Sequence, residues 1–297
     1  MENPEPSLKN AFFVRDLIES FRFVKRKFWT YFLSMVISII LAIVVFIGIA
    51  VLISILVFSN IYALANGFQQ FNQILFVIVG IAALTITFFL TFVAPLYGIS
   101  AEIIEASESY AERTIYYLKK HFVDFFIASL IIAVGGFLLP AYIIGGIKSL
   151  LEIAGIYNAV SAHILFTSLF VLDIILIGGL SFMYPAIVAR KPVREAFLES
   201  IDIMRHHFLR IYPSQMIMVM ILIGLVQPFT LFGLAVANGL NPIIYAPIVS
   251  IYAFIFIILL IIMLSTYTIL ITRIYWIINS SDIPAARQPK GIQLIGE

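Results

Sequence analysis

The sequence predicts an all-α integral membrane protein with six transmembrane helices. Of its 297 residues, 62% are hydrophobic and only 11% are charged, and the mean hydropathy is +1.09. Soluble domains carry about 25% charged residues, and a soluble fold of this composition would expose more apolar surface than water tolerates. No Asp, Glu, Lys or Arg occurs between Lys27 and Glu102 or between Arg210 and Arg273. Each gap can hold two spans, since a spanning helix needs about 20 apolar residues.

The six spans are placed by these apolar runs and by the shorter ones between them. They are expected near residues 28–58, 73–99, 122–147, 163–189, 209–235 and 243–277. The first and last runs exceed the length that a bilayer needs, which indicates tilt or extension along the interface. The first run is too long for a signal peptide and no small-residue cleavage site follows it, so we expect it to be retained.

The orientation follows from the Lys and Arg residues, which favour the cytoplasmic side. They cluster before the first span, in the 100–121 loop, in the 190–210 stretch and after the last span, all on one side of a six-span topology. Of the 18 Lys and Arg residues, only Lys148 falls on the opposite side. This asymmetry predicts a multi-pass protein of the cell membrane with both termini in the cytoplasm.

An internal repeat is indicated by three basic triplets, each followed by a phenylalanine. The three runs are Lys25-Arg26-Lys27-Phe28, Lys119-Lys120-His121-Phe122 and Arg205-His206-His207-Phe208. We predict a single membrane domain with parallel repeats at 10–99, 100–189 and 190–281, followed by a flexible tail at 282–297. The alternative is coincidence, because positive-inside topology by itself places basic clusters before spans.

Each repeat is predicted to begin with an amphipathic helix lying at the membrane surface. Ahead of the first triplet, Phe13, Leu17, Phe21, Val24 and Phe28 recur at steps of four, four, three and four, which is the spacing of one helix face. The opposite face carries the polar residues Asp16, Glu19, Arg22 and Arg26. We therefore expect such a helix to lie in the headgroup plane, with its apolar side down and its basic end at the phosphates.

One stretch of the chain resembles a group of prokaryotic and archaeal membrane proteins. The residues concerned are Tyr184-Pro185-Ala186-Ile187-Val188, Glu195-Ala196, Glu199-Ser200 and Met204-Arg205-His206-His207-Phe208. This run resembles the inner segment of six-span proteins that include the membrane domain of some glycerophosphoryl diester phosphodiesterases. The resemblance implies a six-helix membrane domain with interfacial helices. It implies no activity, because the phosphodiesterase chemistry of that group belongs to a separate soluble barrel.

No catalytic or cofactor motif is present in the sequence. It contains no His-Glu-x-x-His, P-loop, dinucleotide fingerprint or Gly-x-Ser-x-Gly motif. It also contains no Cys, which excludes thiolate chemistry and thiolate metal sites. We therefore predict a protein that is not an enzyme, holds no cofactor or metal, and does not bind nucleic acid.

The candidate site residues form two groups with different implications. The candidates for lipid or interface contact are Lys25, Arg26, Lys27, Lys119, Lys120, Arg205, His206 and His207. Asp173 is the intramembrane candidate, about 15 Å deep at 1.5 Å per residue, where a carboxylate costs about 2.5–3.5 kcal/mol. Gln227 lies at a similar depth in the fifth span and could hydrogen-bond it.

Two functions follow from these groups. The first is an interaction of the basic cytoplasmic helices with membrane lipids or with a partner, either a membrane protein or a second copy of the chain. The alternative is a transporter or channel for a proton, a cation or a small solute that uses Asp173.

Overall fold

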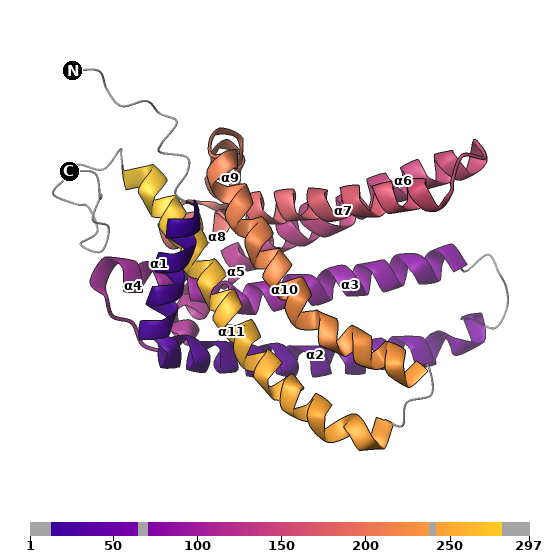
Figure 1. Cartoon of the computed structure of the whole chain (residues 1–297), viewed down its shortest axis with the longest axis horizontal. Helices are drawn as coiled ribbons and strands as arrows, with labels where there is room; N and C mark the ends of the chain where they lie inside the picture. The colour runs from indigo at the N-terminus through magenta and orange to yellow at the C-terminus, as the bar shows by residue number, and fades with distance from the viewer. Residues whose placement is uncertain (1–12, 65–70, 238–241, 281–297) are drawn as a thin grey trace. The chain divides into compact units, whose positions relative to one another are not determined.

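The computed structural model describes residues 13–64, 71–237 and 242–280, and every element in these ranges is a helix (Figure 1). This confirms the predicted all-α fold class. Within the described residues, six helical stretches are long and apolar enough to cross a membrane, which confirms the predicted number. They are Phe28–Gly48, Gly80–Ala106, Arg113–Ile153, Ala159–Val188, Phe208–Gly233 and Ala246–Asn279.

The helices follow one another with short connections. In chain order they are α1 (Phe13–Arg26), α2 (Phe28–Leu64), α3 (Phe71–Val93), α4 (Pro95–Ala106), α5 (Arg113–Ile132), the π-helix η3 (Ala133–Leu138), α6 (Leu139–Ile153), α7 (Ala159–Leu180), α8 (Met183–Val188), α9 (Val193–His206), α10 (Phe208–Ala237) and α11 (Pro242–Ser280). Helices suit these apolar runs because each helix satisfies its own backbone hydrogen bonds, which lipid cannot do. The predicted tail, 282–297, lies outside the described residues.

A break separates each predicted surface helix from the span that follows it. α1 ends at Arg26 and α2 begins at Phe28, while α9 ends at His206 and α10 begins at Phe208. α5 continues past the middle triplet, but the backbone of His121 is non-helical, with φ −122° and ψ 19°. The interruption therefore falls on the third residue of every triplet: Lys27, His121 and His207. The threefold repeat itself stays a prediction.

The chain forms two compact units, which cut across the predicted repeats. The first unit contains Met1–Leu33, Ile99–Ala111 and Ile203–Glu297, and the second contains Ser34–Gly98 and Glu112–Asp202.

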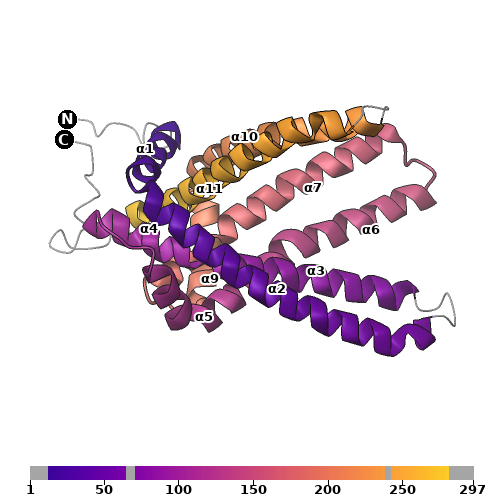
Figure 2. The same cartoon turned by 90° about the horizontal axis from the view of Figure 1, so that it is seen from below.

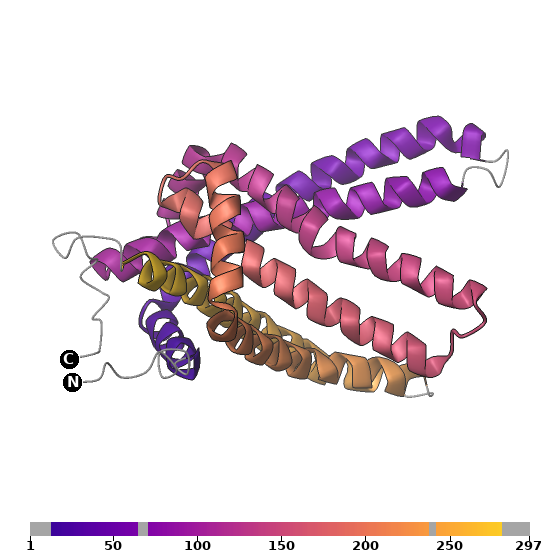
Figure 3. The same cartoon turned by 90° about the horizontal axis from the view of Figure 1, so that it is seen from above.

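The first unit is built on the pair of long helices α10 and α11, which lie side by side (Figures 2 and 3). α1 packs against both of them. In the same unit, the hydroxyls of Tyr31 and Ser100 lie 2.9 Å apart, and Ser100 donates to Thr268 at 3.3 Å. All three side chains are buried. The core of this unit therefore mixes apolar packing with paired hydroxyls, as buried polar groups require.

The second unit has an aromatic core centred on Tyr184 of α8. The Tyr184 ring stacks on Tyr97 with centroids 4.9 Å apart, and Phe125 meets it edge-on at 6.1 Å. The hydroxyls of Tyr184 and Ser129 lie 2.9 Å apart. In the same unit α6 and α7 form an antiparallel pair, and α7 begins at a capping box in which Asn158 accepts hydrogen bonds from the backbone N–H groups of Val160 and Ser161.

Candidate functional site

The three surface segments share one pattern of exposure when they are aligned on the phenylalanine that follows each triplet. The apolar residues seven positions before that phenylalanine, Phe21, Ile115 and Ile201, are exposed. The basic residues three positions before it, Lys25, Lys119 and Arg205, are exposed as well. The apolar residues one position after it are exposed too: Trp29 at 69%, Val123 at 66% and Leu209 at 64%. Each segment thus exposes an apolar, a basic and an apolar residue at matching sequence positions, and we call these three residues the interface line of that segment.

The packed faces of the three segments also correspond. Each segment buries a hydroxyl residue eight positions before its phenylalanine: Ser20, Thr114 and Ser200. A hydroxyl tolerates burial on a helix because it can bond a backbone carbonyl of the preceding turn. Ser20 donates to the Asp16 carbonyl at 2.6 Å, and Ser200 donates to the Phe197 carbonyl at 2.7 Å.

The structure divides the faces of α1 differently from the predicted apolar stripe. Phe21 of the stripe is exposed, together with Val14 and Ile18, but Val24 of the stripe is 1% exposed and Asp16 of the opposite, polar face is 3% exposed. The physical reason is that Asp16 has cationic partners inside the protein. The burial of Asp16 removes its face of α1 from solvent and leaves Val14, Ile18 and Phe21 turned outward. The side chain of Phe13, at the start of the predicted stripe, lies outside the described residues.

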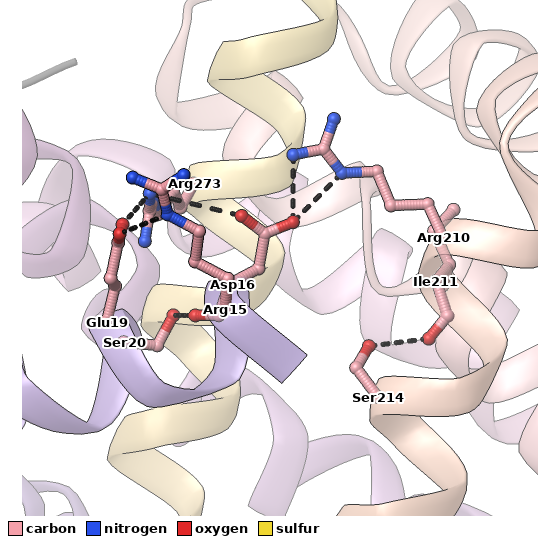
Figure 4. A network of polar contacts seen from close by, with 8 residues as sticks. All are labelled: Arg15, Asp16, Glu19, Ser20, Arg210, Ile211, Ser214 and Arg273. Atoms are coloured by element: carbon pink, nitrogen blue, oxygen red, sulfur yellow. Dashed lines mark hydrogen bonds and ion pairs between the residues drawn. The ribbon is translucent and has the colours of Figure 1, made fainter. Parts of the chain in front are cut away.

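An ion-pair network fixes α1 within the first unit, as Figure 4 shows. Nε and Nη2 of Arg210, in the first turn of α10, donate to Oδ2 of Asp16 at 3.0 and 2.8 Å. Arg273, near the end of α11, lies 3.9 Å from Oδ1 of Asp16 and pairs with Glu19. Arg15 donates to Glu19 at 3.0 Å. Two acidic residues one turn apart on α1 therefore tie this helix to both α10 and α11, and Val14, Ile18 and Phe21 are left exposed.

The predicted lipid or interface candidates lie at the ends of these segments. Lys25, Arg26, Lys119, Lys120, Arg205 and His206 are exposed, and Lys27 and His207 are half-buried. Nζ of Lys120 lies 5.4 Å from the centre of the Tyr116 ring, a cation–π distance. His121 of the middle triplet is instead buried beside the rings of Tyr117 and Phe125.

The intramembrane candidates lie in different compact units. Asp173 is half-buried on α7, and its Oδ1 is buried without a hydrogen-bond partner in the part of the chain that the structure describes. Gln227 is exposed on α10. The hydrogen bond between them stays a prediction. Within the described ranges, no group of three or more His, Asp and Glu side chains could hold a metal ion.

Glu19 carries the pH dependence of the α1 network. Burial by itself raises the pKa of Glu19, but the hydrogen bonds and charges of Arg15 and Arg273 outweigh burial and hold the pKa below the ordinary value of 4.5. A carboxylate with a lowered pKa stabilises the fold above its unfolded-state pKa, and this contribution is lost as the pH falls through its folded-state pKa.

We therefore expect Glu19→Gln to lower the thermal unfolding midpoint at pH 7, with a difference from the unaltered protein that holds down to about pH 5 and shrinks below pH 4.5. Unfolding of the detergent-solubilised protein, followed by intrinsic fluorescence from pH 7 to pH 3, measures this difference. Glu195→Gln, at an exposed position of α9, is the control and should change the unfolding midpoint at pH 7 much less than Glu19→Gln does. A Glu19→Gln effect that does not change with pH would contradict the assignment.

Comparison with protein-family models, with curated proteins and with solved structures gave no match, so the family resemblance of the inner segment stays an expectation.

Proposed function

We propose that this membrane protein has no catalytic activity and binds anionic lipid headgroups at the cytoplasmic membrane surface through its three interface lines. The supporting observation is the repeated exposure of an apolar, a basic and an apolar residue at matching positions of three separate segments. An amphipathic surface inserts its apolar side chains at the boundary between headgroups and acyl chains. Its basic residues then lie at the level of the lipid phosphates, where each contributes about 1 kcal/mol of attraction to an anionic surface.

The anchoring of α1 supports the same proposal. A surface helix that binds lipid has to be held at a fixed depth with its apolar side facing the bilayer. Asp16 and Glu19 pair with arginines at the ends of α10 and α11, which are the membrane ends of two spans. The basic triplet Lys25-Arg26-Lys27 comes directly before the first residue of a third span. The cytoplasmic location of this surface is proposed from the positive-inside asymmetry.

Trp29 is a built-in reporter for the test, because it ends the interface line of α1 and the chain has only two Trp residues. Trp276→Phe leaves Trp29 as the sole Trp. We expect phosphatidylglycerol with brominated acyl chains to quench Trp29 fluorescence more than equally brominated phosphatidylcholine does in mixed vesicles. Replacing Lys25, Arg26 and Lys27 by Gln should reduce this preference several-fold, since each charge contributes about 1 kcal/mol at most.

Lys148→Gln is the matched control, because it also removes a basic residue but at a position far along the chain from Trp29. The quenching of Trp29 should not change in this variant. Added salt should weaken the preference of the unaltered protein, because it screens charges at the surface. Equal quenching by the two lipids, or a preference that survives loss of the triplet, would refute lipid binding by this segment.

Transport through a site at Asp173 is the second candidate function, favoured by the buried Oδ1 of that residue, which has no hydrogen-bond partner among the described residues. Transport pathways commonly carry several polar groups at depth, whereas Asp173 is the single carboxylate deep within its span. A proteoliposome flux assay that compares the unaltered protein with Asp173→Asn tests this alternative.

A further inference from the structure

A groove of about 460 Å³ runs between α6 and α7 in the second unit, beside the turn that joins them. Volumes of about 300–1,000 Å³ are typical of sites that hold a small organic molecule. The groove is lined by Ala141, Ile144, Gly145, Lys148, Tyr157, Ala162, Leu165, Phe166 and Leu169. From Ala162 to Leu169 it follows α7 for about 10 Å at 1.5 Å per residue, from the turn toward the middle of the span.

One end of the groove is polar and the rest is apolar. The polar end holds the ammonium of Lys148, 5.5 Å from the centre of the Tyr157 ring. Lys148 is also 3.6 Å from Oε1 of Glu152, and both side chains are about half exposed. An ion pair this exposed contributes at most about 1 kcal/mol, so it does not prevent the ammonium from meeting another anion. Aliphatic and aromatic side chains form the other walls.

We propose that this groove binds one glycerophospholipid molecule, with its phosphate at Lys148 and one acyl chain along α7. A Lys ammonium at the end of a groove between transmembrane helices can pair with a lipid phosphate, and a Tyr at the end of a span is typical of the membrane interface. The site is separate from the basic triplets. Lys148 lies near the end of the stretch Arg113–Ile153, beside the turn between α6 and α7, whereas Lys119 and Lys120 lie near its start.

A second copy of the chain fits the polar end less well than a lipid does. The loops on the side of Lys148, at 59–72, 148–162 and 236–242, contain one acidic residue, Glu152. That residue is already the partner of Lys148. A phospholipid supplies both an anion for the ammonium and a chain for the apolar walls.

The two adjacent glycines of α6 provide a matched pair of variants. A Cβ atom added at Gly145 or at Gly146 would meet no other atom within 4 Å, so either site accepts a larger residue. Only Gly145 lines the groove. Gly145→Leu should therefore fill the groove, whereas Gly146→Leu should leave it open while adding the same apolar bulk to the same helix.

The experiment is photolabelling in vesicles with phosphatidylglycerol that carries a photoactivatable acyl chain, with labelled peptides mapped by mass spectrometry. We expect labelling of residues 141–169 to fall several-fold in Gly145→Leu and to be unchanged in Gly146→Leu. The unaltered protein should be labelled more strongly by this probe than by a photoactivatable diacylglycerol, which has no phosphate, and Lys148→Gln should abolish that difference.

Equal labelling of the two glycine variants would overturn the site, and equal labelling by the two probes would overturn the role of Lys148. Cross-links from this segment to a second copy of the chain, in place of lipid, would assign the groove to self-association. The basic triplets remain intact in all of these variants, so the outcome does not depend on the proposed cytoplasmic lipid surface.

Discussion

Asp16→Ala is expected to release α1 from α10 and α11 and to destabilise the protein by about 3–5 kcal/mol, the range seen when one partner of a buried ion pair is removed. Asp16 is almost fully buried, and Arg210 and Arg273 are each more than four-fifths buried. When the Asp16 carboxylate is removed, these two buried guanidinium groups lose the negative charge that it places beside them. The cost therefore exceeds that of a lost hydrogen bond, which is about 0.5–1.5 kcal/mol.

Thermal unfolding in detergent and hydrogen exchange of the α1 amides measure the two expected consequences. A free helix of 14 residues is only marginally stable in water, so α1 amides should exchange faster while those of α7 stay protected. Glu195→Ala, at an exposed position of α9, should change stability by no more than about 0.5 kcal/mol.

A double-mutant cycle tests whether the effect belongs to the ion pair itself. Asp16→Ala combined with Arg210→Ala should cost clearly less than the sum of the two single changes, since groups in contact are not additive. Additive effects would mean that Asp16 stabilises α1 through something other than Arg210. Unchanged exchange of the α1 amides in Asp16→Ala would overturn the anchoring role altogether.

The number of spans could be predicted from the sequence because lipid imposes a strict length and polarity on each one. The breaks before the spans were also indicated, since each falls within a basic triplet that favours the membrane surface over its interior. Such rules act locally along the chain and do not depend on which helices touch.

The packing face of α1 could not be predicted from periodicity. In water an apolar stripe indicates the protein core, but lipid tails are as apolar as leucine, so the same stripe can face the bilayer. Ile18 and Phe21 are exposed, and Asp16 packs inward because it pairs with Arg210, 194 residues away in the sequence. A usable signal was present: Arg210 and Arg273 are the two charged residues that bound the fifth and sixth spans, which places both at the same membrane surface.

The core of the second unit depends on a glycine whose role the sequence does not reveal. A Cβ atom on Gly98 of α4 would lie 2.5–2.6 Å from three ring atoms of Tyr117. Tyr117 cannot easily move aside, because it is nearly buried and its ring packs on Tyr116 and His121 with centroids 5.4 and 6.4 Å away. Gly98→Ala should therefore destabilise the protein by about 1–3 kcal/mol, the usual cost of overpacking a core.

The opposite sign is expected at Gly80 of α3, where an added Cβ meets nothing within 4 Å. There Ala should be neutral or stabilise by up to about 1 kcal/mol, because Ala loses less backbone entropy than Gly in a helix. Thermal unfolding of Gly98→Ala, Gly80→Ala and the double variant Gly98→Ala/Tyr117→Leu separates the clash from helix propensity. If the clash is the cause, the smaller and more flexible leucine makes Gly98→Ala less harmful than it is beside the tyrosine. Similar unfolding midpoints for the two alanine variants would show that Tyr117 does not need a glycine beneath its ring.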